Sequence, residues 1–191
     1  MQTFAAYIDQ LPPAERYAIR EAVPAETWTS IERTSPLGWL PAATNLVCTH
    51  AVAARLGSRG THEFFANLML SSFDTALLRG LVTAVVRLAG RDFAQYLNWV
   101  SKGFGLMFRD CGDWKVIERG EGSASLEVRG LPLDFAKDRV WLESTASGLG
   151  ALYDLVGIQG AVVIRETDPA RGRAVYRLRW SESGEPPSSV R

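Results

Sequence analysis

Two cysteines and two histidines are the side chains of this sequence best suited to act as nucleophile, base or zinc ligand. Cys48 and His50 form the one close pair. On a helix, residues two apart point about 200° away from each other, so this thiol and this imidazole cannot share a face. Because a nucleophile and its base need hydrogen-bonding reach, the spacing favours a structural role for both.

A metal site is not expected either. His62 stands beside Glu63 in a pattern typical of the first turn of a helix. Two histidines among scattered carboxylates show none of the ligand spacings of zinc sites. Cys111, which precedes Gly112 at a helix-to-strand junction, is the candidate reactive thiol for lipidation or redox chemistry. That chemistry requires an exposed thiol with a lowered pKa.

Paired glycines do not indicate a cofactor loop. Gly103-x-Gly105 and Gly148-x-Gly150 do not follow a strand and open a helix, as a dinucleotide-binding loop does. Glycine inside a helix costs about 1 kcal/mol, so Gly148 and Gly150 are expected to let a helix approach a sheet closely. Without a nucleophile–base pair, a metal site or a cofactor loop, the protein is not expected to be an enzyme, and no cofactor is expected.

Length and composition indicate one domain over residues 1–180, helical over 1–110, followed by a disordered tail at 181–191. The chain has 191 residues, 47% of them hydrophobic, and its 21 basic residues equal its 21 acidic ones. Zero net charge argues against nucleic-acid binding, and two cysteines are no disulfide framework. The apolar stretch Leu77–Ala89 is too short and polar to span a membrane. With no signal peptide at Met1–Gln10, a cytoplasmic location is expected.

The first 110 residues show helical apolar spacing with frequent stops. The turn 35–38 separates two short helices from longer ones, and Gly57 is expected to end one of these as a left-handed cap. Gly103 and Gly105 are expected to interrupt the last helix. The predicted helices run from the prolines at 12–13 to about Ala22, then over Ala25–Arg33, Ala42–Leu56, about 58–71, Thr75–Leu88 and Phe93–Lys102.

After Gly112 the apolar period changes from about 3.6 to 2. Trp114, Val116 and Glu118 are predicted to share one face of a strand, and Gly120-Glu121-Gly122 to form a hairpin turn. A helix that starts at Asp134 or Asp138 is expected to reach Val156. The predicted strands are 114–119, 123–129, Ala161–Thr167 and Ala174–Trp180. The fold class is therefore α+β, with an N-terminal helical layer on a four-stranded antiparallel ββαββ sheet crossed by one long glycine-containing helix.

This order of elements resembles a known superfamily. The segment Trp141–Gly157, with the small residues Ser147, Gly148 and Gly150, is similar to the central helix of the haem-nitric-oxide-binding, 4-vinyl-reductase-type and Bet3-like superfamily. Within that group the chain looks most like a paralogous family of uncharacterised bacterial proteins, through the stretches Leu88-Ala89-Gly90, Gly130-Leu131-Pro132 and Arg177-Leu178-Arg179-Trp180. The resemblance covers about residues 40–180.

The resemblance implies a fold and a pocket. Superfamily members bind haem, an acyl chain, an aromatic effector or partner proteins. Haem-binding members use an axial histidine and a Tyr-x-Ser-x-Arg motif, whereas this chain has only His50 and His62 and lacks the motif. Aromatic-sensing members carry a cysteine-rich zinc site in the C-terminal part, and here only Cys111 lies before that part. Neither haem nor zinc is therefore expected.

Aromatic residues concentrate around the expected helix–sheet interface, where they form either an ordinary core or the wall of a pocket. The predicted ligand-binding residues are Trp99, Phe104, Phe108, Trp114, Trp141 and Tyr153. On the opposite face of the sheet, Arg165, Arg173, Arg177 and Arg179 form either a solvated surface or a surface for an anionic partner.

The predicted function is a non-catalytic regulatory or sensory module that binds a small apolar ligand, a partner protein, or both. The alternative is a structural or assembly protein that acts as a homodimer. Tyr17, Trp28 and Trp39, on the N-terminal helices, are the exposed candidates for that interface. An enzyme ranks last.

Overall fold

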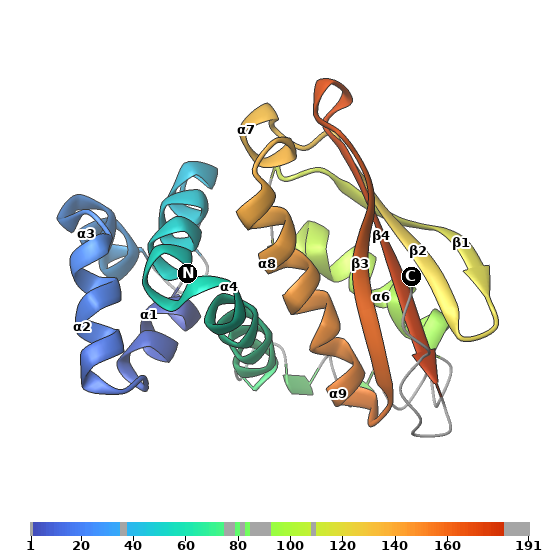
Figure 1. Cartoon of the computed structure of the whole chain (residues 1–191), viewed down its shortest axis with the longest axis horizontal. Coiled ribbons are helices and arrows are strands. Elements are labelled where there is room, and N and C mark those ends of the chain that lie inside the picture. Colours follow the sequence, from blue (N-terminus) through green and yellow to red (C-terminus); the bar gives the residue numbers. More distant parts are fainter. Residues whose placement is uncertain are drawn as a thin grey trace.

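The computed structural model describes residues 2–34, 38–74, 79–80, 83–84, 93–107 and 110–181. In Figure 1, α1–α3 lie at one end of the molecule, α4 follows, and α8 separates α4 from the sheet. The helices of the first part are α1 (Gln2–Asp9), α2 (Pro13–Ala22), α3 (Ala25–Arg33), α4 (Ala42–Phe73) and α6 (Phe93–Met107). The predicted turn at 35–38 and helix Thr75–Leu88 fall largely outside the described residues.

The short helices α2 and α3 confirm the prediction, and α1 is an addition to it. Pro12 and Pro24 stand at the N-caps of α2 and α3, where a missing N–H costs nothing. The first helix lacks such a marker. It packs because Phe4 and Ile8, one turn apart, are both buried in the helical core. That core also contains Ile19, Val23, Trp28, Ile31, Cys48, Val52 and Phe64.

Helix α4 is two helical segments joined at Gly57. This glycine has φ 65° and ψ −176°, a conformation open to glycine and strained for other residues. The break confirms the position of the predicted stop, but a ψ of −176° is not the left-handed cap that was predicted. The chain resumes helical structure at once, with the Thr61 hydroxyl donating to the Gly57 carbonyl oxygen at 2.6 Å. The predicted interruption of α6 is wrong, because the helix continues through Gly103 to Met107.

The C-terminal part is a four-stranded antiparallel sheet of β1 (Asp113–Gly120), β2 (Ser123–Arg129), β3 (Gln159–Asp168) and β4 (Arg173–Ser181), in the order β1-β2-β4-β3. Between β2 and β3 run α7 (Leu133–Ala136), α8 (Arg139–Gly150) and α9 (Leu152–Val156). The inner face of the sheet is formed by alternate residues of its two central strands, since Ala124, Leu126 and Val128 of β2 and Tyr176 and Leu178 of β4 are fully buried. The α+β class with a helical N-terminal part is confirmed (Figure 1).

The crossing helix begins where a cap was predicted. Asp138 accepts a hydrogen bond from the Trp141 backbone N–H at 2.8 Å through Oδ1, the geometry of an N-cap. The helix breaks at Ala151 into α8 and α9 and ends at Gly157, which has φ 69°. Helices α6 and α8 pack on the same inner face of the sheet.

One detail of the sheet differs from the prediction. A β-bulge between Val116 and Glu118 shifts the register of β1. The shift turns Glu118 to the outer face, so it does not share a face with Trp114 as predicted.

The glycines of α8 do not face the sheet. A Cβ on Gly148 would stand 3.0 Å from Met69 Cε of α4, and one on Gly150 would meet nothing within 4 Å. Gly148 therefore allows α8 to approach α4, which corrects the expectation that both glycines serve contact with the sheet. The close approach to the sheet occurs at Gly160 instead, beside the Tyr153 ring.

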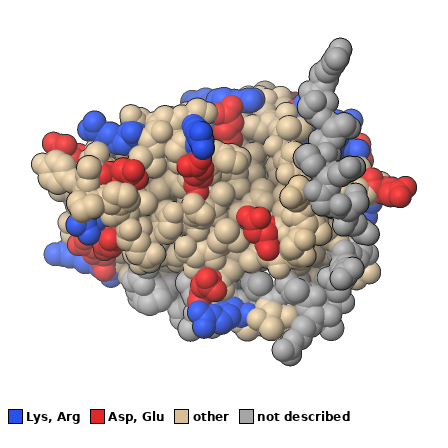
Figure 2. Space-filling model, turned by 60° about the horizontal axis from the view of Figure 1, so that its bottom comes forward, with Lys and Arg blue, Asp and Glu red and all other residues tan. Residues whose placement is uncertain are grey.

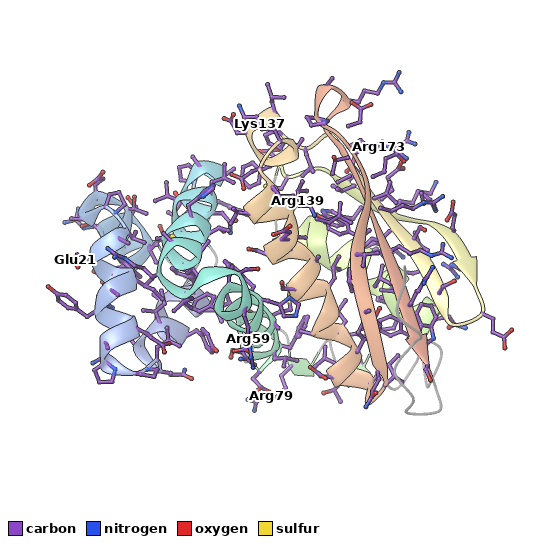
Figure 3. The ribbon with its side chains drawn as sticks, viewed as in Figure 1. Glu21, Arg59, Arg79, Lys137, Arg139 and Arg173 are labelled. Atoms are coloured by element: carbon purple, nitrogen blue, oxygen red, sulfur yellow. The ribbon has the colours of Figure 1, made fainter. Side chains whose placement is uncertain are left out.

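The outer face of the sheet is held by ion pairs that cross all four strands. Arg173 donates to Glu127 at 2.6 Å and to Glu166 at 2.6 Å. Glu118 accepts from Arg165 at 2.6 Å and from Arg177 at 3.0 Å. Three of the four arginines singled out from the sequence are thus paired with carboxylates of the same sheet. This pairing favours the interpretation of the arginine face as a solvated surface over its interpretation as a binding surface for an anionic partner. Figure 3 labels Arg173 on this sheet.

These carboxylates should make stability depend on acid pH. Hydrogen bonds from Ser125 and Arg165 lower the pKa of Glu118. Burial would raise the pKa of Glu127, but hydrogen bonds from Arg129 and Arg173 outweigh it and lower the pKa. A group with a depressed folded pKa contributes fully above its unfolded pKa, about 4.3 for Glu, and loses this contribution as pH falls through the folded value.

We therefore expect the free energy of unfolding to fall from about pH 5 downward. The Glu118→Gln/Glu127→Gln variant should be less stable than the parent at pH 7 and should vary less with pH below 5. Urea titrations between pH 2 and 7 measure the stability at pH 7 and its change with pH. Glu143→Gln is a surface control that removes only the ion pair with Arg139 within the helix. Parallel curves for the parent and the double variant would contradict this assignment.

The described surface carries charges of both signs. On the face in Figure 2, basic and acidic side chains are scattered over a surface of mostly uncharged residues. None of the described helices combines the length and apolar character needed to cross a membrane.

Candidate functional site

A pocket of about 130 Å³ lies where α4, α8 and β1 meet. Its apolar walls come from Phe65, Leu68 and Met69 of α4, Trp141 and Gly148 of α8, and Trp114 of β1. The polar lining consists of Asn45, Thr49, Ser72, Cys111, Ser144 and Thr145. None of these described lining residues is charged at neutral pH, so the pocket suits an uncharged molecule.

Both segments of α4 contribute to the pocket. Asn45 and Thr49 precede the break at Gly57, and Phe65, Leu68 and Met69 follow it. The angle that Gly57 imposes therefore brings two faces of one chain segment around the same space. Without that break, a straight helix would carry these two groups of residues about four to seven turns apart along its axis.

Polar contacts fasten α4 to α8 beside the pocket. The Trp141 indole N–H donates to Asn45 Oδ1 at 2.9 Å. His50 Nε2 lies 2.5 Å from Asp138 Oδ2, the second oxygen of the capping carboxylate. His62 Nδ1 lies 2.8 Å from the Ser147 hydroxyl. These bonds fix the width of the space between the two helices.

The inner face of the sheet brings a buried hydroxyl next to the pocket. The Tyr176 ring stacks on Trp114, with ring centroids 5.8 Å apart and planes 21° apart. Burial raises the pKa of Tyr176, and the adjacent Thr145 side chain partly opposes the rise. The hydroxyl is fully buried, and none of the described side chains or backbone groups forms a hydrogen bond of good geometry with it. Tyr176 is not among the residues that line the pocket.

The predicted aromatic residues divide into two groups. Trp114 and Trp141 line the pocket, as does Cys111. Tyr153 lies elsewhere, in a core cluster with Phe93, whose ring centroid is 4.9 Å away.

Trp99, 44% exposed on α6, is not among the residues that line this pocket, and the Lys102 ammonium lies 5.1 Å from its ring centroid. Phe108 and the Phe104 side chain fall outside the described residues. The α4 residues Phe65, Leu68 and Met69 complete the pocket and were not predicted, since their helical stripe looked like ordinary core.

Cys111 is buried, and this burial together with the Asp110 carboxylate raises its thiol pKa. A raised pKa depletes the thiolate that lipidation or redox chemistry requires. In the pocket the thiol therefore serves as a small, weakly polar lining group.

The described residues offer no activated nucleophile among the cysteines and histidines. Burial raises the pKa of Cys48 to about 12, and Cys48 sits in the helical core while His50 contacts Asp138. The Ser147 hydroxyl touches His62, but it is buried and also donates to the Glu143 carbonyl oxygen at 2.9 Å. Its proton is therefore not directed to the imidazole, as general-base activation requires.

The residues of this site do not fit haem. Haem iron is held by His, Cys, Met or Tyr side chains, and both histidines of the chain lie in the α4–α8 contact, outside the pocket lining. Of the other ligand types, the pocket lining holds Cys111, whose thiol pKa is raised by burial, and Met69, which lies against Gly148 of α8. The pocket of about 130 Å³ is also well below the roughly 300–1,000 Å³ of sites for larger ligands.

We expect haemin added to the full-length protein to give no stoichiometric, sharpened Soret band. An absorbance titration measures this, and the His50→Ala/His62→Ala variant should give the same spectra as the parent. A one-to-one Soret complex that either substitution abolishes would show that a histidine can leave its present contact and bind iron.

Comparisons with known proteins identify the fold. No family model matches the chain, and no curated protein does. Among solved structures, the Fe(II) unliganded H-NOX protein from K. algicida is similar with a TM-score of 0.58 and 10% identity, over 100% of this chain and 96% of that one. An oxygen-binding H-NOX domain related to soluble guanylate cyclases gives a TM-score of 0.59 and 11% identity, over 98% and 96%.

The Cs H-NOX mutant with 4-cyano-L-phenylalanine at site 5 gives a TM-score of 0.60 and 12% identity, over 95% of this chain and 94% of that one. The likeness spans the whole length of each protein and is therefore a likeness of complete architecture. The resemblance to vinyl-reductase-type and Bet3-like proteins, and to a particular bacterial family, stays a prediction. At such low identity the similarity concerns architecture alone, and the chain has the fold of H-NOX domains.

Proposed function

We propose that this protein is a non-catalytic sensory module that binds a small apolar molecule in the pocket between α4, α8 and β1. The observation that carries the proposal is the pocket itself, an apolar space of about 130 Å³ at the junction of the helical layer and the sheet. Ligand sites in proteins are typically concave, apolar and furnished with a few polar groups. Two tryptophans and several hydroxyls give this pocket that character.

The fold supports a sensory role. One similar structure is an oxygen-binding H-NOX domain, and another concerns haem distortion in the H-NOX family. This chain shares their architecture, but in the part that the structure describes both histidines lie outside the pocket lining. We infer that it binds its ligand directly, without haem.

The mechanism would be a shift in population between two packings of α4. A ligand in the pocket touches residues on both sides of the Gly57 break and residues of α8. The ligand would favour the packing in which the two segments of α4 and helix α8 have the separation that the structure shows. A ligand shifts such an equilibrium only by its difference in affinity for the two states.

Native mass spectrometry of the freshly purified full chain tests the proposal, compared with its denatured mass. Extra non-covalent mass that disappears on denaturation supports a bound ligand. Bare protein mass, together with no binding of any small apolar probe in solution, would overturn it.

A partner protein would receive the signal. Tyr17 and Trp39 are 70% and 51% exposed and remain candidates for that contact or for a homodimer. Trp28, the third predicted residue, is no longer a candidate, because it is buried under Arg20 and its indole N–H donates to the Arg20 carbonyl oxygen at 3.0 Å. Light scattering over a concentration series, with Tyr17→Ser/Trp39→Ser as the variant, distinguishes a dimer from a monomer that needs another partner.

A further inference from the structure

We infer that the ligand of the pocket is a small, uncharged aliphatic molecule with one oxygen that accepts a hydrogen bond, an alcohol or a ketone, and that the Thr49 hydroxyl donates this bond. The inference rests on the proposed function and names the ligand class of the same pocket. Three features carry it: a buried lining hydroxyl without a described partner, the absence of charge among the described lining residues, and aromatic lining residues that already pack against other rings.

The Thr49 hydroxyl is free to donate a hydrogen bond into the pocket. Thr49 lines the pocket and is 1% exposed, so the little surface that it keeps faces this space. Hydroxyls inside helices commonly bond to the carbonyl oxygen four residues earlier, as Thr61 does with Gly57. None of the described groups forms a hydrogen bond with the Thr49 hydroxyl. A buried hydroxyl without a partner carries a desolvation cost, which an acceptor on a ligand would remove.

The other hydroxyls of the lining are already engaged. Ser72 and Ser144 each donate to the carbonyl oxygen four residues earlier in their own helix, at 2.8 Å. The Thr145 side chain interacts with the Tyr176 hydroxyl outside the pocket lining. The proton of Thr49 is therefore the one that these hydroxyls leave for a ligand. An alcohol or ketone oxygen would accept it, whereas a hydrocarbon would leave the desolvation cost in place.

Size and charge exclude larger and ionised molecules. The pocket of about 130 Å³ is close to the engineered cavity of about 150 Å³ that holds benzene or xenon. Long acyl chains and fused polycyclic molecules exceed it. A carboxylate or an ammonium group would lose its hydration and meet no described counter-ion in the lining. Such a transfer is costly unless the charge is paired.

The aromatic residues of the lining already have ring partners. Trp141 meets Phe135 edge to face, with ring centroids 4.8 Å apart. Phe65 meets Phe64 in the same way, at 5.2 Å. Trp114 stacks on a tyrosine ring of the sheet. A ligand ring is therefore not needed to complete these pairs, and the flexible methionine of the lining adapts to a saturated, non-planar skeleton.

Four fluorinated probes of similar size test the inference by ¹⁹F NMR with the full chain: 4,4-difluorocyclohexanol, 1,1-difluorocyclohexane, 4-fluorophenol and 4,4-difluorocyclohexanecarboxylate. We expect the cyclohexanol to bind tightest and the carboxylate not to bind. Thr49→Val keeps the branched shape of the side chain and removes the hydroxyl. It should weaken binding of the cyclohexanol about 3- to 10-fold, the equivalent of one hydrogen bond, and leave 1,1-difluorocyclohexane unchanged.

Stability supplies an independent readout of the same variant. Thr49→Val should unfold at the same urea concentration as the parent or at a higher one, because it replaces an unpaired buried hydroxyl by a methyl group. Thr29→Val is the matched control. It makes the same substitution on α3, outside the pocket lining, where the hydroxyl donates to the Ala25 carbonyl oxygen at 3.0 Å. This control should leave the binding of all four probes unchanged.

Each part of the inference has an outcome that overturns it. Equal binding of cyclohexanol and difluorocyclohexane, no loss of cyclohexanol binding in Thr49→Val, or a lower unfolding midpoint of that variant would overturn the polar contact. Tighter binding of 4-fluorophenol would overturn the aliphatic class, and preferred binding of the carboxylate would overturn the uncharged class. If no probe binds while native mass spectrometry shows a bound compound, the ligand class is wrong and the proposed function stands. If both experiments are negative, both fall.

Discussion

Replacing Gly160 with alanine should destabilise the protein by about 3 kcal/mol, the upper range for forced overpacking. An added Cβ would stand 2.4 Å from Tyr153 Cζ, 2.5 Å from Tyr153 Cε2 and 2.6 Å from the Arg179 carbonyl oxygen. The first two contacts press on a ring fixed in the core against Phe93. The third presses on the backbone of the neighbouring strand, which cannot rotate away.

Urea unfolding followed by far-UV circular dichroism measures the loss. Gly150→Ala is the matched control, because its added Cβ meets nothing within 4 Å and alanine is favoured over glycine in a helix by about 0.5–1 kcal/mol. We expect that control to be as stable as the parent or more so. Equal unfolding midpoints for the two variants would show that the Tyr153 ring does not pack against Gly160 of β3 as described above.

Filling the pocket from Gly148 should abolish ligand binding. Gly148 lines the pocket, and a Cβ there would already stand 3.0 Å from Met69 Cε. Gly148→Val adds two further methyl groups at this point, so the side chain must occupy the space that a ligand needs. We expect affinity for a small apolar probe, 4-fluorotoluene followed by ¹⁹F NMR titration, to fall at least about 10-fold, since a ligand can re-enter only by displacing packed atoms.

Gly150→Val, two residues further along the same helix, separates this effect from general damage. Both variants place a β-branched residue in α8, which is mildly unfavourable in a helix, but Gly150 faces open space. The ¹⁹F titration and the unfolding midpoint are measured for both. Retained binding in a folded Gly148→Val protein would place the ligand somewhere other than this pocket.

The alternation of apolar residues determined the sheet because its signal is local. Ala124, Leu126 and Val128 recur with period 2 and are all buried, and glycine or proline marks the ends of most helices and strands. The break at Gly57, the hairpin turn and the Asp138 cap follow from the conformational preferences of single residues. The same reasoning missed α1, whose two buried apolar residues are too few to define a period.

The candidate site was half predictable. Trp114 and Trp141 stand out by type, and both line the pocket. Trp99 has the same type and sits over Lys102 on the surface, because an isolated sequence position does not reveal which side of α6 is covered. Phe65, Leu68 and Met69 have the spacing of a core stripe, and nothing local distinguishes a stripe that packs fully from one that leaves a space.

The sequence by itself determined most of the elements and the class of fold. These depend on local periodicity and on turn residues. Only the tertiary structure decided that Gly148 faces α4, that the arginines of the outer face pair with Glu118, Glu127 and Glu166, and that Trp114 and Trp141 line one pocket. Each of these joins residues from 7 to 79 positions apart, and their distance in space is set by how helices and strands pack.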